Sequence, residues 1–193
     1  MTAKFWLLSV GFVLALAGVS SAQTKKEVST KGVINAFPDC TSVDGNLVSN
    51  CGFETGDFTG WTLAGDMVSY VTVDPDAFHS GKFGAHLGPV NYVGLMTQVL
   101  PTAPGQVCEL SFWIRNNGLP STFDVRFGPL QVSPFDPNFG PALHSVIENV
   151  PNTNYTQYTY AFLVVNSNET TLNFTFRNAP SFTDLDDIVV VCS

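Results

Sequence analysis

The stretch that decides the fold is Cys108-Glu-Leu-Ser-Phe-Trp-Ile-Arg115. Apolar residues occupy every second position, beginning with Cys108 and Leu110, while polar residues and Trp113 fill the positions between them. Successive side chains of a β-strand point to opposite faces of a sheet, so this alternation is typical of a strand with one buried face. The sequence therefore predicts a strand here, with Trp113 and Arg115 on its outward face.

The same two-residue period recurs along the chain. It predicts further strands at 46–54, 67–73, 84–88, 93–100, 122–128, 158–164, 172–177 and 188–192. Turn-forming pairs such as Pro104-Gly105 separate these segments, and no stretch after residue 22 sustains the apolar stripe of a helix. Many short strands without helices predict an all-β, two-sheet antiparallel β-sandwich of the jelly-roll type. The proline-rich segment 129–151 is predicted to be a long loop.

Residues 1–22 predict a secretory signal peptide. Lys4 precedes an apolar run from Phe5 to Val19, and small residues up to Ala22 form the cleavage site. A membrane anchor is the alternative, but the run is shorter than the about 20 residues that a span needs. Polar residues 23–44 are predicted to be a flexible tail, and residues 45–193 to form one jelly-roll domain outside the cell.

Cysteines and glycosylation sequons agree with secretion. The four cysteines are Cys40, Cys51, Cys108 and Cys192. An even number in an oxidising compartment predicts two disulfides, although four cysteines allow three pairings and the sequence does not choose among them. Zinc is a poor alternative because the Cys-x-x-Cys spacing is absent. N-glycosylation is predicted at Asn154, Asn168 and Asn173.

The chain is acidic, with 8 Lys and Arg residues against 16 Asp and Glu residues and a net charge of −8. Such a chain lacks the basic surface that neutralises phosphates, which excludes nucleic acid as a partner. It contains no sequence motif of a nucleophile elbow, zinc helix or phosphate loop. Asp186 and Asp187 are adjacent in a predicted strand and so point to opposite faces, which does not suit a glycosidase pair. No catalytic residue is predicted, and the chain is not expected to be an enzyme.

Three segments carry a resemblance to a known family. Asn46-Leu-Val-Ser-Asn-Cys-Gly-Phe-Glu-Thr-Gly-Asp-Phe-Thr-Gly-Trp61 resembles the opening strand of galactose-binding-like jelly rolls, in particular carbohydrate-binding modules of families 4, 9 and 22. His79-Ser-Gly-Lys-Phe-Gly-Ala85 resembles their second motif, and Leu185-Asp-Asp-Ile-Val-Val190 resembles their closing strand. Cys51 and Cys108 depart from the family pattern, and both are predicted to be added disulfide cysteines. In the first segment, Phe53 is expected to enter the core, and Trp61 is expected to close one end of the sandwich.

The resemblance also implies a structural calcium ion. Relatives hold it where the first strand, the H-S-G turn and the last strand meet, and the corresponding positions here are Glu54, Ser80, Asp186 and Asp187. Adjacent carboxylates in an apolar strand need a partner, because an unpaired buried charge is costly and calcium takes six to eight oxygen ligands. The alternative is that these carboxylates cap turns or accept hydrogen bonds from backbone amides.

The predicted function is non-catalytic binding of a polysaccharide or glycan. Aromatic rings that stack on sugars and planar hydrogen-bonding groups occupy outward positions at the predicted strands, namely Trp113, Arg115, Asn117, Arg126 and Arg177. These side chains share one face if their strands are neighbours. The alternative is that the 129–151 loop covers Trp113 and that the arginines pair with acidic residues.

Two further alternatives stay open. A site at the tip of the sandwich would use Tyr70, Phe78, Tyr92, Phe135 and Phe139. The alternative function is a structural or adhesive extracellular protein that uses the same sandwich to contact proteins or matrix. An open outward face around Trp113 favours sugar, whereas a covered face favours the structural role.

Overall fold

The computed structural model describes residues 39–66, 70–89, 91–116, 118, 120–129, 142–150, 154–178 and 180–193. The chain divides into two units, Met1–Ile34 and Asn35–Ser193, and all described residues belong to the second. The predicted signal peptide and most of the predicted tail lie outside the described residues. No helix in the described part is long and apolar enough to cross a membrane.

Residues 39–44 belong to the folded domain. They include one turn of 3-10 helix, η1 (Cys40–Ser42), and the Cys40 side chain is fully buried. The Cys40 backbone N–H donates to Asp187 Oδ1 at 3.1 Å, and a disulfide joins Cys40 to Cys51. The predicted tail boundary at residue 44 is therefore wrong, because both bonds hold this segment on the domain.

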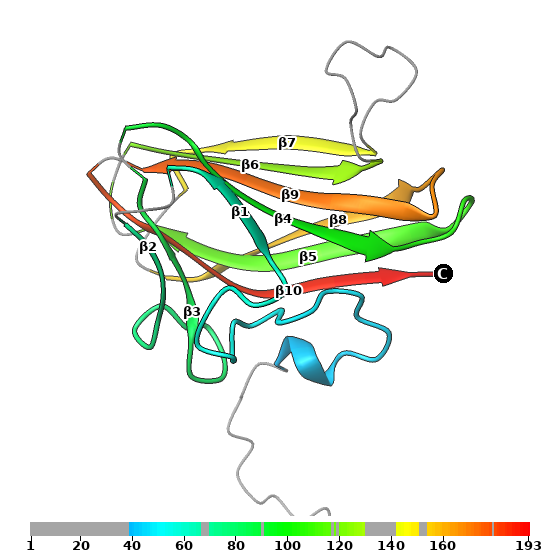
Figure 1. Cartoon of the computed structure of the whole chain (residues 1–193), viewed down its shortest axis with the longest axis horizontal. Helices are drawn as coiled ribbons and strands as arrows, with labels where there is room; N and C mark the ends of the chain where they lie inside the picture. Colours follow the sequence, from blue (N-terminus) through cyan, green and yellow to red (C-terminus); the bar gives the residue numbers. More distant parts are fainter. Residues whose placement is uncertain are drawn as a thin grey trace, which may run out of the picture. The chain divides into compact units, whose positions relative to one another are not determined.

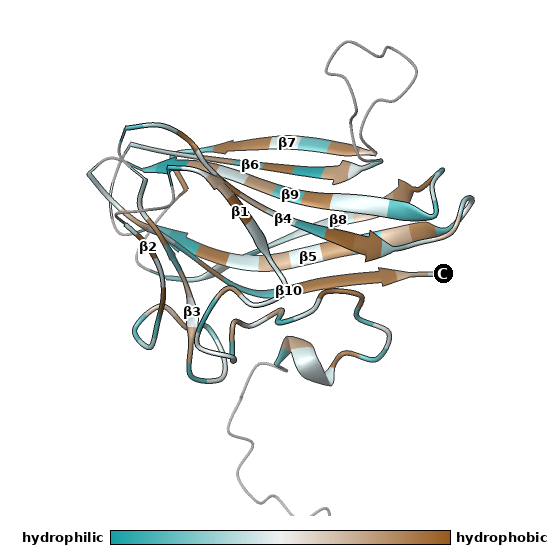
Figure 2. Cartoon of the chain, viewed as in Figure 1, coloured by the Kyte–Doolittle hydropathy of each residue, from teal (hydrophilic) through white to brown (hydrophobic). Residues whose placement is uncertain are grey.

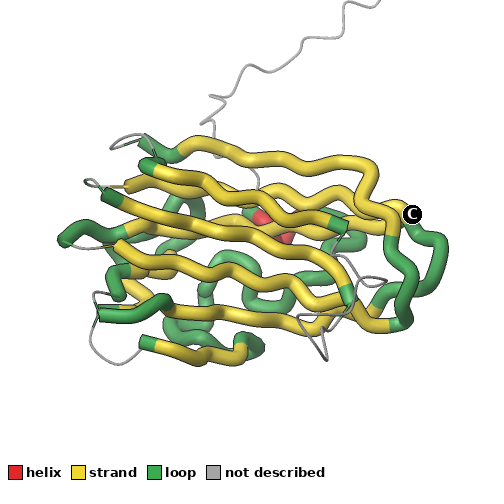
Figure 3. The backbone as a smooth tube through the Cα atoms, turned by 90° about the horizontal axis from the view of Figure 1, so that it is seen from above, coloured by secondary structure: helices red, strands yellow, loops and turns green. Residues whose placement is uncertain are grey.

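The described residues form two five-stranded sheets with antiparallel pairing throughout (Figure 1). We call them sheet A, in the order β1-β4-β9-β6-β7, and sheet B, in the order β2-β3-β10-β5-β8. Figure 3 shows the strands running side by side along the domain. The strands are β1 (Thr62–Gly65), β2 (Val71–Asp74), β3 (Gly84–Leu87), β4 (Gly94–Pro101), β5 (Val107–Asn116), β6 (Ser121–Gly128), β7 (Leu143–Glu148), β8 (Thr156–Val164), β9 (Glu169–Asn178) and β10 (Thr183–Cys192).

The core lies between the inner faces of the two sheets. In β5, Leu110, Phe112 and Ile114 are fully buried, which confirms the predicted alternation. Phe112 meets Phe174 of β9 edge to face with ring centroids 5.3 Å apart, so aromatic packing joins sheet B to sheet A. Burial of each such ring stabilises the fold by about 1.5–3 kcal/mol. Figure 2 shows the apolar positions repeating along these strands.

The segment 46–54 differs from its prediction. It forms turns rather than a strand, with Asn50 and Phe53 in the left-handed region at φ 48° and 57°. Asn50 O accepts from Phe53 N–H, and Phe53 O accepts from Gly56 N–H. These turns still deliver Phe53 to the core, where its ring stacks on Trp61 at a centroid distance of 6.1 Å. The predicted burial of both aromatics is confirmed, although the strand is wrong.

Two other elements departed from expectation. β7 lies within the segment 129–151 that was predicted to be a loop, and β1 was not predicted at all. Both strands are at the edges of sheet A, and their side chains are mostly exposed or half-buried. An edge strand needs less apolar alternation than a central one, so its sequence pattern is weaker.

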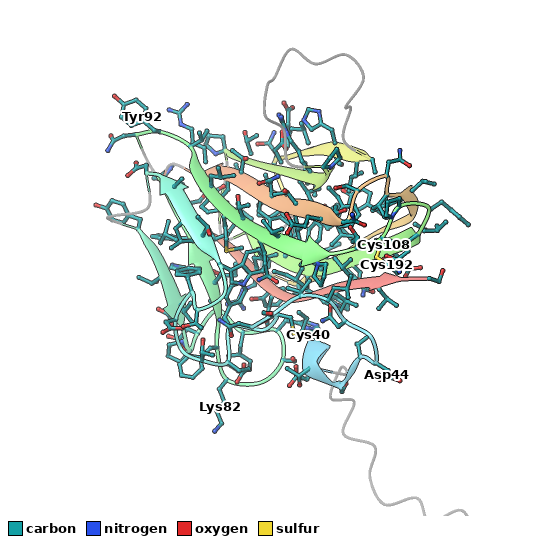
Figure 4. All side chains as sticks on the ribbon, turned by 45° about the vertical axis from the view of Figure 1, so that its right-hand side comes forward. Cys40, Asp44, Lys82, Tyr92, Cys108 and Cys192 are labelled. Atoms are coloured by element: carbon teal, nitrogen blue, oxygen red, sulfur yellow. A yellow bond between two sulfur atoms is a disulfide. The ribbon has the colours of Figure 1, made fainter. Side chains whose placement is uncertain are left out.

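The two disulfides join Cys40 to Cys51 and Cys108 to Cys192, which confirms the predicted number and selects one pairing of three. Cys108 and Cys192 are cross-strand partners in β5 and β10, and Figure 4 shows them together near the ends of these strands. Their separation of 84 residues is much larger than the 11 residues between Cys40 and Cys51. The longer loop restricts the unfolded chain more.

We predict unequal losses when the two disulfides are removed. Replacing Cys108 and Cys192 by alanine should lower the free energy of unfolding by about 3–5 kcal/mol, because a long loop is released in the unfolded state. The matched double replacement of Cys40 and Cys51 should cost about 2 kcal/mol less, because its loop is shorter. Urea denaturation of both variants measures the difference, and an equal or reversed order would contradict the loop-length explanation.

Candidate functional site

The topology separates the predicted sugar-binding residues. β5, which carries Trp113 and Arg115, lies in sheet B, whereas β6 and β9, which carry Arg126 and Arg177, lie in sheet A. All four side chains occupy outward positions, so the two pairs lie on opposite outer faces of the sandwich. The prediction of one shared face is therefore wrong. Asn117 lies outside the described residues.

The part of sheet B that carries Trp113 is engaged in internal contacts. The Trp113 ring stacks on His79 with ring centroids 4.0 Å apart, and the His79 side chain is 5% exposed. Arg115 Nε donates to Asp184 Oδ2 at 2.7 Å, and the guanidinium lies 4.9 Å from the centroid of the Tyr155 ring. The alternative expectation, that the arginines pair with acidic residues, holds for Arg115. This half of the face is closed by the turn that contains His79.

Asp186 and Asp187 form a buried carboxylate pair beside that turn. Asp186 Oδ2 accepts from the backbone N–H groups of His79 at 2.7 Å and Ser80 at 3.0 Å. Asp187 Oδ1 accepts from Ser80 Oγ at 2.8 Å, and Asp187 Oδ2 lies 2.7 Å from His79 Nδ1. Burial, followed by the negative charge of Asp187, raises the pKa of Asp186 to about 8.

The adjacency of Asp186 and Asp187 in the sequence predicts that their side chains point to opposite faces, and this prediction is wrong. The pairing of β10 with β5 shifts register between Asp186 and Val189, and Asp187 has a φ of 48°. A bulge of this kind re-aims side chains, so both carboxylates reach the same turn. The period-two pattern of the sequence gives no sign of this local irregularity.

Glu54 joins the same turn from the opening segment. Its Oε1 accepts from the backbone N–H groups of Lys82 at 2.8 Å and Phe83 at 3.1 Å. Gly81 lies beside it with a φ of 66°, and a Cβ there would stand 2.1 Å from Glu54 Oε1. The four residues of the predicted calcium site are thus gathered around residues 79–83. The alternative contacts, hydrogen bonds from backbone amides, are present for all three carboxylates.

Another group of potential metal ligands is formed by Asp39, Cys40 and Cys51, whose ligand atoms lie within 4.8 Å of one another. The two sulfur atoms are joined in a disulfide and carry no thiolate, so they are not metal ligands. The carboxylates of Glu54, Asp186 and Asp187 around residues 79–83 are the better candidate for a hard cation, because such ions prefer oxygen donors.

The outer face of sheet A carries a continuous line of polar side chains. The register aligns one residue from each strand in the order β1-β4-β9-β6-β7. We call this line the polar row, and it consists of Thr62, Thr97, Asn173, Arg126 and His144. Neighbouring strands lie about 4.8 Å apart, so the row extends over about 19 Å. Such a line can place hydrogen-bonding groups along an elongated polar ligand.

Hydrogen bonds hold the polar row in place. Thr97 Oγ1 donates to Asn173 Oδ1 at 2.7 Å. Asp124, which is next to the row on β6, faces His144 Nε2 at 2.8 Å and accepts from Arg126 Nε at 3.2 Å. The expectation that the arginines pair with acidic residues thus also holds for Arg126. His144 was missed as a site residue because only the strand register aligns it with Arg126.

The remaining predicted residues lie elsewhere. Arg177 is exposed on the same face of sheet A, in a register row with Thr122 and Glu148. Tyr92 is 76% exposed and points outward from the loop before β4 (Figure 4). Tyr70 instead packs edge to face on Phe182. Phe135 and Phe139 lie outside the described residues.

We predict that Gly81 is required for the Glu54 contact. Gly81→Ala should lower the free energy of unfolding by about 2 kcal/mol more than Gly105→Ala, because both have positive φ but only Gly81 would collide with Glu54. Gly105 is a matched control, since a Cβ there meets nothing within 4 Å. Thermal denaturation measures both variants. Adding Glu54→Ala to each should remove most of the difference, and a persistent difference would contradict the steric explanation.

Comparison with known proteins places the fold. No protein-family model matches this chain, and no curated protein matches it either. A family 61 carbohydrate-binding module, solved in complex with β-1,4-galactotriose, is similar with a TM-score of 0.61 and 18% identity, covering 77% of this chain and 99% of the module. The CBM22-1 xylan-binding domain of Paenibacillus barcinonensis Xyn10C is similar with a TM-score of 0.54 and 16% identity, covering 73% and 90%.

An enzymatic protein shares the same fold over part of its length. The enzymatically active domain of tailspike protein 4 from bacteriophage CBA120 is similar with a TM-score of 0.56 and 17% identity, covering 77% of this chain but 22% of that one. The chain therefore has the galactose-binding-like jelly-roll fold of carbohydrate-binding modules, as its sequence motifs predicted. At these identities the likeness defines the fold, and function has to be argued from the residues.

Proposed function

We propose that this protein is a secreted, non-catalytic carbohydrate-binding protein whose ligand lies across sheet A along the polar row. The observation that carries the proposal is the alignment of five polar side chains, one on each of the five neighbouring strands of sheet A. A row of this length suits an oligosaccharide segment of a polysaccharide better than a single sugar. Two disulfides support an extracellular location, because such bonds persist in oxidising compartments.

The chemistry of the row suits sugar hydroxyl groups. Arg126 presents several N–H donors in one plane, and the amide of Asn173 can both donate and accept, so each can bind neighbouring hydroxyls. Asp124 acts as a positioning residue because it holds Arg126 and His144. Val99 and Val146, each 50% exposed on the same face, offer apolar surface to the C–H groups of a sugar ring. Arg177 extends the polar surface, whereas Trp113 and Arg115 support the fold from sheet B.

We predict that Arg126→Ala and His144→Ala each weaken polysaccharide binding by about tenfold or more, because each removes a hydrogen bond to the ligand. A glycan array followed by calorimetry on the best ligand measures the loss. Trp113→Ala, on the opposite sheet, is the control and should leave the affinity unchanged once its folding is verified. Loss of binding in Trp113→Ala with normal binding in Arg126→Ala would place the site on sheet B. Absence of binding to every polysaccharide would favour the structural or adhesive alternative.

One of the three predicted glycosylation sites lies on the outer face of sheet A. Asn154 and Asn168 are exposed outside the strands, whereas Asn173 lies within the polar row on the central strand β9. A glycan on Asn173 would occupy the row, so carbohydrate binding requires Asn173 to be unmodified in the binding form. Glycosylation of Asn154 and Asn168 remains compatible with the proposal.

We predict that glycosylation at Asn173 abolishes binding. Thr175→Val removes the sequon and keeps Asn173, so protein made in glycosylating cells should bind as well as or better than the wild type. Mass spectrometry of glycopeptides identifies which asparagines are modified. Full binding by protein that is fully glycosylated at Asn173 would exclude the polar row as the site.

We also propose a structural calcium ion at residues 79–83. Glu54, Asp186 and Asp187 supply carboxylate oxygens around one turn, and the backbone carbonyl of Ser80 would add another oxygen, a donor set that calcium prefers. Burial, followed by the negative charge of Asp187, raises the pKa of Asp186 to about 8, so two negative charges at this place are costly unless a positive charge lies beside them. A bound calcium ion would supply that charge and tie the opening segment to β10.

For this proposal we expect calcium at a saturating concentration to raise the melting midpoint by about 5 °C or more over protein in chelator, because the ion binds the folded state alone. Glu54→Gln should reduce the increase, since it removes one carboxylate. Differential scanning calorimetry measures both proteins. An identical midpoint with calcium and with chelator would mean that hydrogen bonds alone hold the carboxylates.

A further inference from the structure

Phe162 stands out among the described residues of β8. Its side chain is 86% exposed, and its backbone has a φ of 61°, in the left-handed region that a bulky residue rarely adopts. The pairing of β8 with β5 is irregular here, because it shifts register between Cys108 and Leu110. Such bulges re-aim side chains and strained positions often have a functional reason. Within one copy of the chain, burial of the Phe162 ring does not compensate for this unusual backbone conformation, because the ring stays exposed.

An apolar hollow lies beside Phe162 on the outer face of sheet B. Its volume is about 460 Å³, and the residues that line it include Val107, Glu109, Ala161, Phe162, Val189 and Val191. An engineered apolar cavity of about 150 Å³ already binds benzene, so this hollow has room for a phenyl ring. Figure 2 shows the apolar ends of β8 and β10 that border it.

Charge indicates which partner suits this surface. The chain has a net charge of −8, so two copies repel each other over most of their surfaces. β8 contains no charged residue, and Glu109 is the one charged side chain among the residues that line the hollow. Val164, 51% exposed, and Val107, 38% exposed, extend the apolar surface next to Phe162. Among the side chains that line the hollow, only Glu109 therefore repels a like copy, although the chain as a whole is acidic.

We propose that two copies of this chain form a two-fold symmetric dimer in which each Phe162 inserts into the hollow of the other copy. An isologous interface needs a projection and its complement on the same patch, and Phe162 borders the hollow that would receive its counterpart. β8 is an edge strand of sheet B, and its bulge opposes continuous strand addition. A two-fold contact uses this patch on both copies, so the assembly stops at the dimer. The polar row, on the outer face of sheet A, remains free.

The test is sedimentation equilibrium of the purified chain over a wide concentration range. We expect a monomer–dimer equilibrium for the wild type. Phe162→Asn should raise the dissociation constant by about 100-fold or more, because each dimer loses two buried rings. Asparagine tolerates positive φ, so this variant should fold as well as the wild type. Tyr92→Asn removes another exposed aromatic, 76% exposed and outside the lining of the hollow, and should leave the dissociation constant unchanged.

Val191→Glu provides a second variant, since it places two like charges in each dimer interface next to Glu109. It should also abolish the dimer while the melting midpoint of the monomer stays close to that of the wild type. A wild type that is monomeric at every concentration would overturn the proposal, and the hollow would then belong to another ligand. A Phe162→Asn variant that dimerises like the wild type would overturn it as well.

Discussion

The contacts of the buried carboxylates Asp186 and Asp187 with the turn at His79–Ser80 are the constraint on which the rest of the surface depends. Asp187 also accepts from the Cys40 backbone, so the same pair joins η1, the segment after β2 and the last strand. A buried carboxylate needs several hydrogen-bond donors, and the chain supplies them by folding the turn over sheet B. His79 then stacks on Trp113, which closes this half of the face.

Because the turn at His79 covers one half of the outer face of sheet B, two surfaces remain for ligands: the outer face of sheet A and the other half of sheet B. Sheet A retains an outer face crossed by the polar row, with side chains oriented by Asp124 and Thr97. The far half of sheet B keeps an apolar hollow with Phe162 at its border. The two outer faces thus differ in chemistry, polar on sheet A and apolar at the hollow, so the proposed saccharide and the proposed second copy would not compete for one surface.

The sequence predicted the fold because strand alternation and core aromatics are local properties. Alternation placed β5 and β9 correctly, and the three motif segments indicated the galactose-binding-like jelly roll. The burial of Phe53 and Trp61 follows from the sequence although their segment forms turns, since large apolar side chains are buried whichever backbone carries them. The gathering of Glu54, Ser80 and the two aspartates around one turn also followed from the motifs.

By itself, the sequence determined which residues form strands, how many disulfides are possible and which segments resemble the family, because these depend on residue type and spacing. Tertiary structure alone decided the strand order, and with it that Trp113 lies on the sheet opposite Arg126. It also chose the disulfide pairing, bent β10 at Asp187 and aligned His144 with Arg126. The physical reason is that backbone hydrogen bonds are the same for every side chain and can join any two strands, so packing between distant segments decides which strands pair and in which register.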